Sequence, residues 1–172
     1  MRIRRAVLSD APGIARVHIA SWKTTYKDMI PDTILLNLSH VERMDLWKRN
    51  MTKGDQYILV AVNMCGEIVG FAACRRRNDF LPENSGEITS FYLLADYQGI
   101  GIGKQLLQRL FKQLIQWGLD NIFVEVLEEN ASCGFYEYFG ASLLQSKQIL
   151  FAGTELVLCV YEWKHIQEIK IS

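Results

Sequence analysis

The spacing of hydrophobic positions changes several times along the chain, and each change predicts a different kind of element. Over residues 14–26, apolar and aromatic side chains recur every three or four positions, which is typical of a helix. Pro31 breaks this run, and a second helical region is expected over about 32–50. The pattern then becomes that of β structure, and residues 56–63 and 67–76 predict a hairpin closed by a short turn.

The second half of the chain alternates between strand-like and helix-like patterns. The helix expected over 102–117 carries its apolar residues on one side only. Further strands are expected at 3–8, 87–94, 122–127, 143–151 and 154–163, and a short helix at 131–139. This order, β-α-α-β-β-β-α-β-α-β-β, predicts a mixed α/β sheet with helices on both faces. With 172 residues and no internal repeat or linker, the chain is expected to form one domain over 1–172.

The turn before the one-sided helix contains three glycines where a helix should begin. Residues 97–107 read YQGIGIGKQLL, and each glycine costs about 1 kcal/mol relative to alanine inside a helix. Their presence indicates that something approaches the backbone closely. A helix N-terminus binds anions because several N–H groups converge there and the helix dipole adds partial positive charge. We therefore expect the backbone from Gln98 to Lys104 to bind phosphate.

Two common phosphate-binding motifs do not fit this turn. The dinucleotide fingerprint would need a glycine where Lys104 stands. The Walker loop would need a glycine in place of Gln98 and a serine or threonine in place of Gln105. The pattern [QR]-x-x-G-x-[GA] matches in full over residues 98–103. The alternative is a plain strand-to-helix turn, for which one glycine would suffice.

The motif and its surroundings resemble the Gcn5-related N-acetyltransferase (GNAT) superfamily. The matching features are the strand EITSFYLL before the turn, the amphipathic helix after it, and then Asn130, Tyr136 and Gly140. The resemblance covers nearly the whole chain, most firmly 56–163, and departs at Ala141, where an aromatic residue is common in the family. It implies a central mixed, mostly antiparallel sheet, with two strands splayed at a site for acetyl-CoA.

The resemblance implies which residues hold acetyl-CoA as co-substrate. The pyrophosphate would lie against the backbone of Gln98, Gly99, Ile100, Gly101, Ile102, Gly103 and Lys104, and the pantetheine arm would pair with the main chain of Phe91, Tyr92, Leu93 and Leu94. A main-chain N–H near Leu93 would stabilise the oxyanion. Asn130 resembles the side-chain partner of the pantetheine arm; alternatively, it caps the helix expected at 131–139.

Two side chains are candidates for proton transfer. Tyr136 matches the family tyrosine that faces the sulfur, and a phenol can donate a proton to the leaving thiolate. Glu87 lies eleven residues before Gln98, the spacing of the general-base glutamate in histone-acetylating members. A base is needed because alkyl amines have a pKa near 10.4 and are protonated at neutral pH. The alternatives are core packing for Tyr136, and a solvated Glu87 with ordered water as the base.

The acceptor should bind to the parts of the chain that such families share least. These are the two N-terminal helices, where Trp22 and Tyr26 are candidates for cation–π contact with an amine or for plain core packing, and the polar loop 78–86. The expected reaction is direct attack of a primary amine, of a small molecule or peptide, in a ternary complex. A route through Cys133 is disfavoured because no histidine stands beside it in the sequence. The alternative function is a non-catalytic acyl-CoA-binding module.

Composition excludes several other classes. Lys+Arg and Asp+Glu both total 19, which argues against nucleic acid as a partner, although residues 75–77 form a local arginine triplet at a strand end. The four cysteines and three histidines show no metal-ligand spacing, so no metal is expected. No signal peptide or membrane span is visible, which predicts a cytoplasmic protein. The terminal strands are candidates for pairing across a homodimer.

Overall fold

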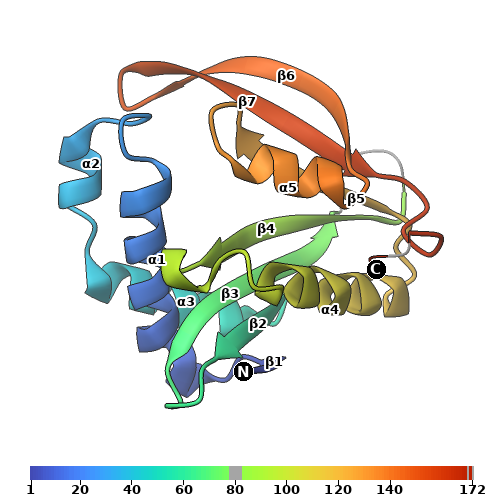
Figure 1. The fold of residues 1–172 in the computed structure, drawn as a ribbon, viewed down its shortest axis with the longest axis horizontal. Coiled ribbons are helices and arrows are strands. Elements are labelled where there is room, and N and C mark those ends of the chain that lie inside the picture. Colours follow the sequence, from blue (N-terminus) through green and yellow to red (C-terminus); the bar gives the residue numbers. More distant parts are fainter. Residues whose placement is uncertain (78–82, 170, 172) are drawn as a thin grey trace.

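A mixed sheet with the strand order β1-β2-β3-β4-β5-β7-β6 runs through the molecule (Figure 1). This computed structural model describes residues 1–77, 83–169 and 171. The strands are β1 (Arg2–Arg5), β2 (Gln56–Val62), β3 (Ile68–Arg77), β4 (Ser85–Leu93), β5 (Asn121–Leu127), β6 (Ser142–Phe151) and β7 (Thr154–Trp163). Only the β4–β5 pair is parallel within these residues. The predicted mixed, mostly antiparallel sheet is thus confirmed.

Helices cover both faces of this sheet, as the sequence predicts. The helices are α1 (Ala11–Thr25), α2 (Asp32–Leu36), α3 (His40–Lys53), α4 (Ile102–Gln116) and α5 (Ser132–Tyr138), with short 3₁₀ turns at η1 (Leu8–Asp10) and η2 (Ala95–Tyr97). Figure 1 shows α1 and α3 on one side of β2 and β3, and α4 on the other side. No helix in the described part of the chain is long and apolar enough to cross a membrane.

Two predicted elements are shorter than expected because side chains take over backbone hydrogen bonds. The first strand ends at Arg5, since the Asp10 carboxylate accepts the Val7 N–H at 2.8 Å and pairs with Arg4 at 2.6 Å. The helical region at 32–50 divides into α2 and α3. Ser39 caps the second of these, and its hydroxyl accepts the Glu42 N–H at 3.3 Å.

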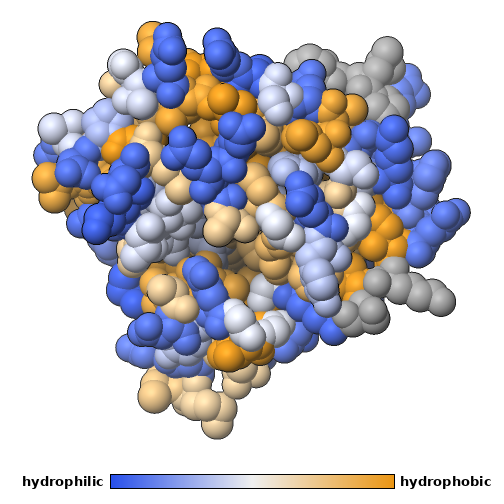
Figure 2. Space-filling view, turned by 45° about the horizontal axis from the view of Figure 1, so that its top comes forward, coloured by the Kyte–Doolittle hydropathy of each residue, from blue (hydrophilic) through white to orange (hydrophobic). Residues whose placement is uncertain are grey.

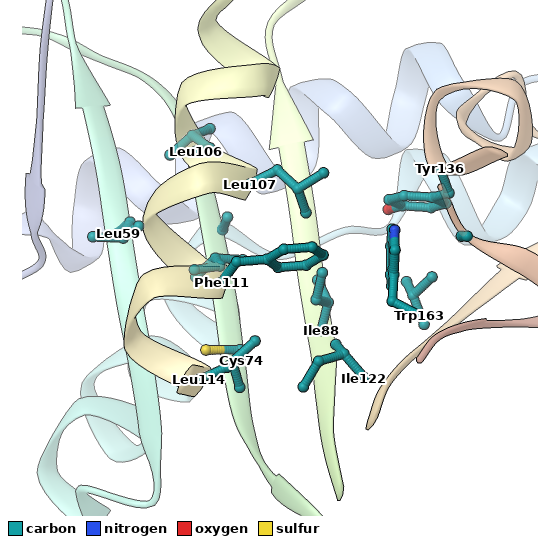
Figure 3. Close-up of a cluster of buried hydrophobic side chains, with 14 of the residues drawn as sticks. Leu59, Cys74, Ile88, Leu106, Leu107, Phe111, Leu114, Ile122, Tyr136 and Trp163 are labelled. Carbon is teal, nitrogen blue, oxygen red and sulfur yellow. The ribbon is translucent and has the colours of Figure 1, made fainter. Parts of the chain in front are cut away.

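The two sides of the sheet have separate hydrophobic cores. The stripe of α4 forms the larger core with β2–β5 and β7. Figure 3 shows Leu106, Leu107, Phe111 and Leu114 in this core, with the Phe111 ring reaching toward Trp163. The smaller core joins α1 and α3 to β2 and β3. Val124 and Val126 of β5 belong to the larger core, so β5 residues between them point to the α1 side of the sheet. Ala141, the departure from the family pattern, is buried in the larger core.

The parallel pair β4–β5 is joined only at its beginning. Its register runs from Ser85 opposite Asn121 to Ile88 opposite Val124, and the strands are not paired beyond this point. A bulge interrupts the register of β4 with β3 directly after Ile88. The later part of β4 therefore offers main-chain groups on the side where β5 has turned away. The splayed strand pair expected from the family resemblance is confirmed.

The strand β6 is an edge strand with little burial on either face. Leu143, Leu144 and Leu150 are all more than half exposed, and Figure 2 shows hydrophobic residues exposed on the upper part of the molecule. A register shift after Leu143 and a lysine at position 147 interrupt the strand, and both features disfavour edge-to-edge pairing. Homodimer formation through the terminal strands stays a prediction.

Candidate active site

A pocket of about 580 Å³ occupies the gap where β4 and β5 separate. Its walls come from β4, β5, the start of α4, the helix α5 and the end of α1. Of the predicted site residues, those that line it are Tyr26, Phe91, Tyr92, Leu93, Gln98, Gly99, Gly101, Gly103, Lys104, Asn130 and Tyr136. These residues span more than a hundred positions of sequence, and the fold gathers them around one cavity.

Five predicted site residues do not line the pocket. Ile100 points to solvent with 64% of its surface exposed, whereas Ile102 is 2% exposed and belongs to the larger core. Leu94 donates its N–H to Val69 on β3. Trp22 and Glu87 bind other side chains. The Ile102 side chain therefore packs in the core and the Ile100 side chain faces solvent, so neither can contact a ligand in the pocket. Their main-chain N–H groups are still part of the turn.

The structure gives two different reasons why glycine stands at the three positions of the turn. Gly99 and Gly101 have φ of 72° and 85°, the left-handed region that side chains rarely adopt, and a Cβ at either position would meet open space. Gly103 is helical, and a Cβ there would lie 3.1 Å from the Phe135 ring. Gly99 and Gly101 therefore shape the turn, while Gly103 lets α5 pack closely against α4. The local motif cannot predict the role of Gly103, because Phe135 lies on another helix.

We expect Gly103→Ala to lower the free energy of unfolding by roughly 1–2 kcal/mol, because the new methyl group overpacks against Phe135. In a Phe135→Leu background the same change should instead stabilise the protein by up to about 1 kcal/mol, the helix preference of alanine over glycine. Urea unfolding of the four proteins measures this coupling. An equal effect of Gly103→Ala in both backgrounds would contradict the packing explanation.

The turn directs free N–H groups into the pocket. The first N–H groups of α4 have no acceptor within the helix, and Gly101 starts the helix in the left-handed conformation. The Gln98 side chain donates to the Leu93 carbonyl at 3.0 Å, which ties the turn back to the end of β4. Lys104, in the first turn of the helix, adds a positive charge to the lining. This arrangement suits a phosphate group.

The exposed edge of β4 can pair with an extended ligand. Successive residues of a strand direct their main-chain groups to opposite sides. Because the Leu94 N–H bonds to Val69 on β3, the N–H of Leu93 must point away from β3 and toward the gap. Phe91, two residues earlier, shares this direction. The main chain thus offers donors along the pocket wall, as the pantetheine and oxyanion predictions require.

Asn130 lies at the pocket, in the turn directly before α5. It is 7% exposed and lines the pocket. Its Oδ1 accepts the Ser132 N–H at 2.9 Å, but the N-cap residue of α5 is Ala131, so Asn130 belongs to the turn before the helix. Among the described residues its Nδ2 has no recorded protein acceptor, which leaves this donor available to a ligand. The pantetheine role stays a prediction.

Tyr136 lies on the buried side of α5 and reaches the pocket with its hydroxyl. Its ring stands nearly perpendicular to the indole of Trp163, with centroids 5.6 Å apart (Figure 3). The residue is only 4% exposed, and its hydroxyl has no recorded hydrogen-bond partner in the described chain. Burial, and then the nearby Tyr92 and Cys133, raise the pKa of Tyr136 well above its ordinary value. The phenol is thus neutral and carries a proton that it can donate.

Glu87, the predicted base, lies outside the pocket lining. Its carboxylate binds the guanidinium of Arg75 on β3, and residue 87 lies in the part of β4 that is still paired with β5. The only carboxylate among the described residues that line the pocket is that of Glu125 on β5. Its side chain is 49% exposed and lies 3.4 Å from the Lys147 ammonium. A lone charge inside the apolar strand IFVEVL was the sequence signal for this residue.

A hydrogen-bonded aromatic cluster closes the α1 side of the pocket. The Tyr92 hydroxyl lies 3.1 Å from the Trp22 indole nitrogen and 3.2 Å from the Tyr26 hydroxyl. Behind it, His18 stacks on the Tyr92 ring and accepts the Trp47 indole N–H at 3.1 Å. Burial lowers the pKa of His18 to about 4, so this imidazole is neutral. Tyr26 lines the pocket as predicted, whereas Trp22 supports it from behind through Tyr92.

The residues present fit acetyl-CoA. The glycine turn offers N–H donors and a lysine to phosphate, the open edge of β4 offers main-chain partners to an amide-rich arm, and Tyr136 stands where the two strands have separated. Bound there, acetyl-CoA would supply an activated acetyl group. The protein would supply orientation, a proton donor and a carboxylate.

Comparison with known proteins agrees with this geometry. Residues 22–141 match the model of the Acetyltransferase (GNAT) family. An uncharacterized N-acetyltransferase of Bacillus subtilis, YuaI, is 33% identical over 98% of this chain and 95% of its own length. A [Ribosomal protein bS18]-alanine N-acetyltransferase of Haemophilus influenzae is 32% identical over 51% of this chain and 57% of its own. An L-methionine sulfoximine/L-methionine sulfone acetyltransferase of Pseudomonas aeruginosa is 29% identical over 80% of this chain and 78% of its own.

Solved structures share the fold. A ribosomal-protein-alanine N-acetyltransferase from Brucella melitensis superposes with a TM-score of 0.77 and 21% identity, covering 95% of this chain and 99% of that one. The structure of YncA from Salmonella typhimurium, solved with its cofactor acetyl-CoA, gives a TM-score of 0.73 at 20% identity, over 95% and 93% of the two chains.

Proposed function

This chain belongs to the GNAT acetyltransferase family, whose members transfer the acetyl group of acetyl-CoA to an amine, and we propose that it acetylates a primary amine of a small molecule or peptide by direct attack in a ternary complex. The observation that carries the proposal is the separation of β4 from β5 after Ile88, with Tyr136 lining the gap and its hydroxyl unpartnered among the described residues. A donor on the β4 edge and an acceptor from the α1 side would meet at this hydroxyl.

We assign each chemical task in the proposed reaction to one residue. The Leu93 N–H, directed into the gap, stabilises negative charge on the acetyl oxygen as the amine attacks. Glu125 takes the proton of the amine, directly or through water, because it is the pocket carboxylate in the described chain. Tyr136 donates its proton to the departing thiolate. Glu87 is no longer the proposed base, because Arg75 engages it outside the pocket.

Direct attack is favoured over a covalent route through Cys133. Burial raises the pKa of this thiol, with smaller opposing and reinforcing contributions from its neighbours, and a thiol with a raised pKa is a poorer nucleophile. Its Sγ contacts the carbonyl oxygens of Leu127 and Glu128 at 3.5 and 3.7 Å. These contacts fit a thiol that packs in its proton-bearing form. Cys133 is therefore assigned a structural place on α5.

The proposed acceptor is a primary amine, and the names of two relatives give examples of acceptors within the family. One is named for the alanine of a ribosomal protein and another for L-methionine sulfoximine and its sulfone. The test of the proposal is thiol release from acetyl-CoA with polyamines, aminoglycosides, amino acids and N-terminal peptides as acceptors. Turnover with one class supports the proposal. Tight binding of acetyl-CoA without turnover in any class would favour the binding-module alternative.

Glu125→Gln tests the base. We expect kcat to fall roughly a hundredfold, the low end for loss of a general base, since water can partly replace an exposed carboxylate. The matched control is Glu87→Gln, which removes a carboxylate of the adjacent strand outside the pocket and should leave kcat within about twofold. Steady-state thiol release measures both variants. A larger loss in the Glu87 variant would return the base to that residue.

A further inference from the structure

The paired hydroxyls of Tyr26 and Tyr92 form a feature of the pocket that the acetyl-transfer steps do not use. Tyr26 ends α1 and Tyr92 lies on β4, and their oxygens are 3.2 Å apart. Both residues line the pocket. Tyr136, the proposed proton donor, lines the same pocket. The acceptor amine must therefore meet the acetyl group in the cavity that these three tyrosines line.

One hydroxyl proton of the Tyr26–Tyr92 pair is not used by the hydrogen bonds of the pair itself. An indole N–H can only donate, so Trp22 donates to the Tyr92 oxygen at 3.1 Å. Each hydroxyl carries one proton, because burial raises the pKa of both groups above the ordinary value. One of the two protons is used in the bond between Tyr26 and Tyr92. The other has no recorded protein acceptor among the residues that the structure describes.

The leftover proton faces the same side of the sheet as Glu125. Tyr92 packs against the smaller core, on the α1 side. Glu125 stands between Val124 and Val126, which face the opposite core, so it too points to the α1 side. An acceptor that enters from this side meets a carboxylate and a hydroxyl donor together. Such a pair complements a group that carries an ammonium next to a hydrogen-bond acceptor.

Charge decides which acceptor group fits. Of the described pocket residues only Lys104 and Glu125 carry a full charge at neutral pH, and Lys104 belongs to the glycine turn. Lys147, which is outside the lining, lies 3.4 Å from Glu125, but both side chains are half exposed, so this ion pair is weak. A free amino acid would still bring its carboxylate close to the Glu125 carboxylate. A neutral carbonyl avoids this repulsion and still accepts the hydroxyl proton. An α-amino group also has a pKa of about 7.7–8.0, far below the 10.4 of an alkyl amine, so more of it is uncharged near neutral pH.

We infer that the acceptor is the N-terminus of a peptide, with its first carbonyl oxygen held by the spare hydroxyl proton of the Tyr26–Tyr92 pair and its α-amino group beside Glu125. This inference rests on the proposed acetyltransferase function and narrows its acceptor. Tyr26 and Tyr92 then determine specificity, and neither takes part in proton transfer to the thiolate. Single substitutions leave one hydroxyl with an unused proton, so both must be changed to remove the donor.

The test compares three small acceptors at saturating acetyl-CoA. L-alaninamide presents a neutral carbonyl, L-alanine a carboxylate, and isopropylamine no carbonyl. We expect the highest kcat/KM for L-alaninamide. In the double variant Tyr26→Phe/Tyr92→Phe, the ratio of kcat/KM for L-alaninamide over isopropylamine should fall roughly tenfold, the order expected for one buried hydrogen bond. Comparing this ratio between proteins cancels both the different amine pKa values and any loss of folded enzyme.

Matched variants sharpen the result. Each single variant should lower the ratio less than the double variant does, and Tyr57→Phe, on β2 outside the pocket lining, should leave it unchanged. An unchanged ratio in the double variant, or a higher kcat/KM for L-alanine than for L-alaninamide, would overturn the inference while leaving the acetyltransferase in place. Absence of thiol release with every amine would overturn the proposed function, and this inference with it.

Discussion

Tyr136→Phe should lower kcat roughly a thousandfold while acetyl-CoA still binds with about its original affinity. The change removes only the hydroxyl, which has no recorded protein partner in the described chain, so the packing of the ring against Trp163 is kept. What is lost is the proton for the leaving thiolate, and general acids contribute roughly 10²- to 10⁴-fold. Because the raised pKa keeps this phenol neutral, its ionisation should not limit activity up to about pH 9.

Steady-state thiol release gives kcat for this variant, and calorimetric titration gives the dissociation constant of acetyl-CoA. Tyr57→Phe is again the control, because it removes a phenol from β2 outside the pocket lining. If Tyr136→Phe retains more than about a third of the original kcat, the hydroxyl is not the acid. Tight binding together with lost turnover would also separate an enzyme from the binding-module alternative, which does not depend on this residue.

Gly101→Val should weaken acetyl-CoA binding by at least roughly a hundredfold. At φ of 85° a β-branched residue is strained by about 1–3 kcal/mol, and relief of that strain would turn the N–H groups of the loop away from the phosphate. The added side chain would also project into the open space in front of the turn. Loss of the backbone donors and obstruction of their ligand act in the same direction.

A second glycine provides a control with matched geometry. Gly66, in the turn between β2 and β3, has the same φ of 85°, and a Cβ there would also meet open space. Gly66→Val should therefore be destabilised to a similar extent in urea, while its dissociation constant for acetyl-CoA stays within about twofold. Equal affinity of the Gly101 variant and the original protein would refute the loop assignment.

Much of the fold follows from local patterns in the sequence. The one-sided stripe of α4 fixes which face of the helix is buried, and the β-rich runs fix the strands, because side-chain spacing alone determines both. The boundaries at Arg5 and between α2 and α3 could not be predicted in this way. They depend on the Asp10 carboxylate and the Ser39 hydroxyl, which compete with the backbone for hydrogen bonds.

Some features of the candidate site could likewise be predicted from the sequence, and others could not. The sequence by itself determined the glycine turn and its match to an acetyltransferase family, because a turn that presents N–H groups to phosphate is built from adjacent residues. Only the tertiary structure decided that Gly103 serves helix packing, that Arg75 engages Glu87, and that Glu125 and the Tyr26–Tyr92 pair meet at one pocket. These outcomes depend on strand register and on the point where β4 and β5 separate, which join residues that lie far apart in the chain.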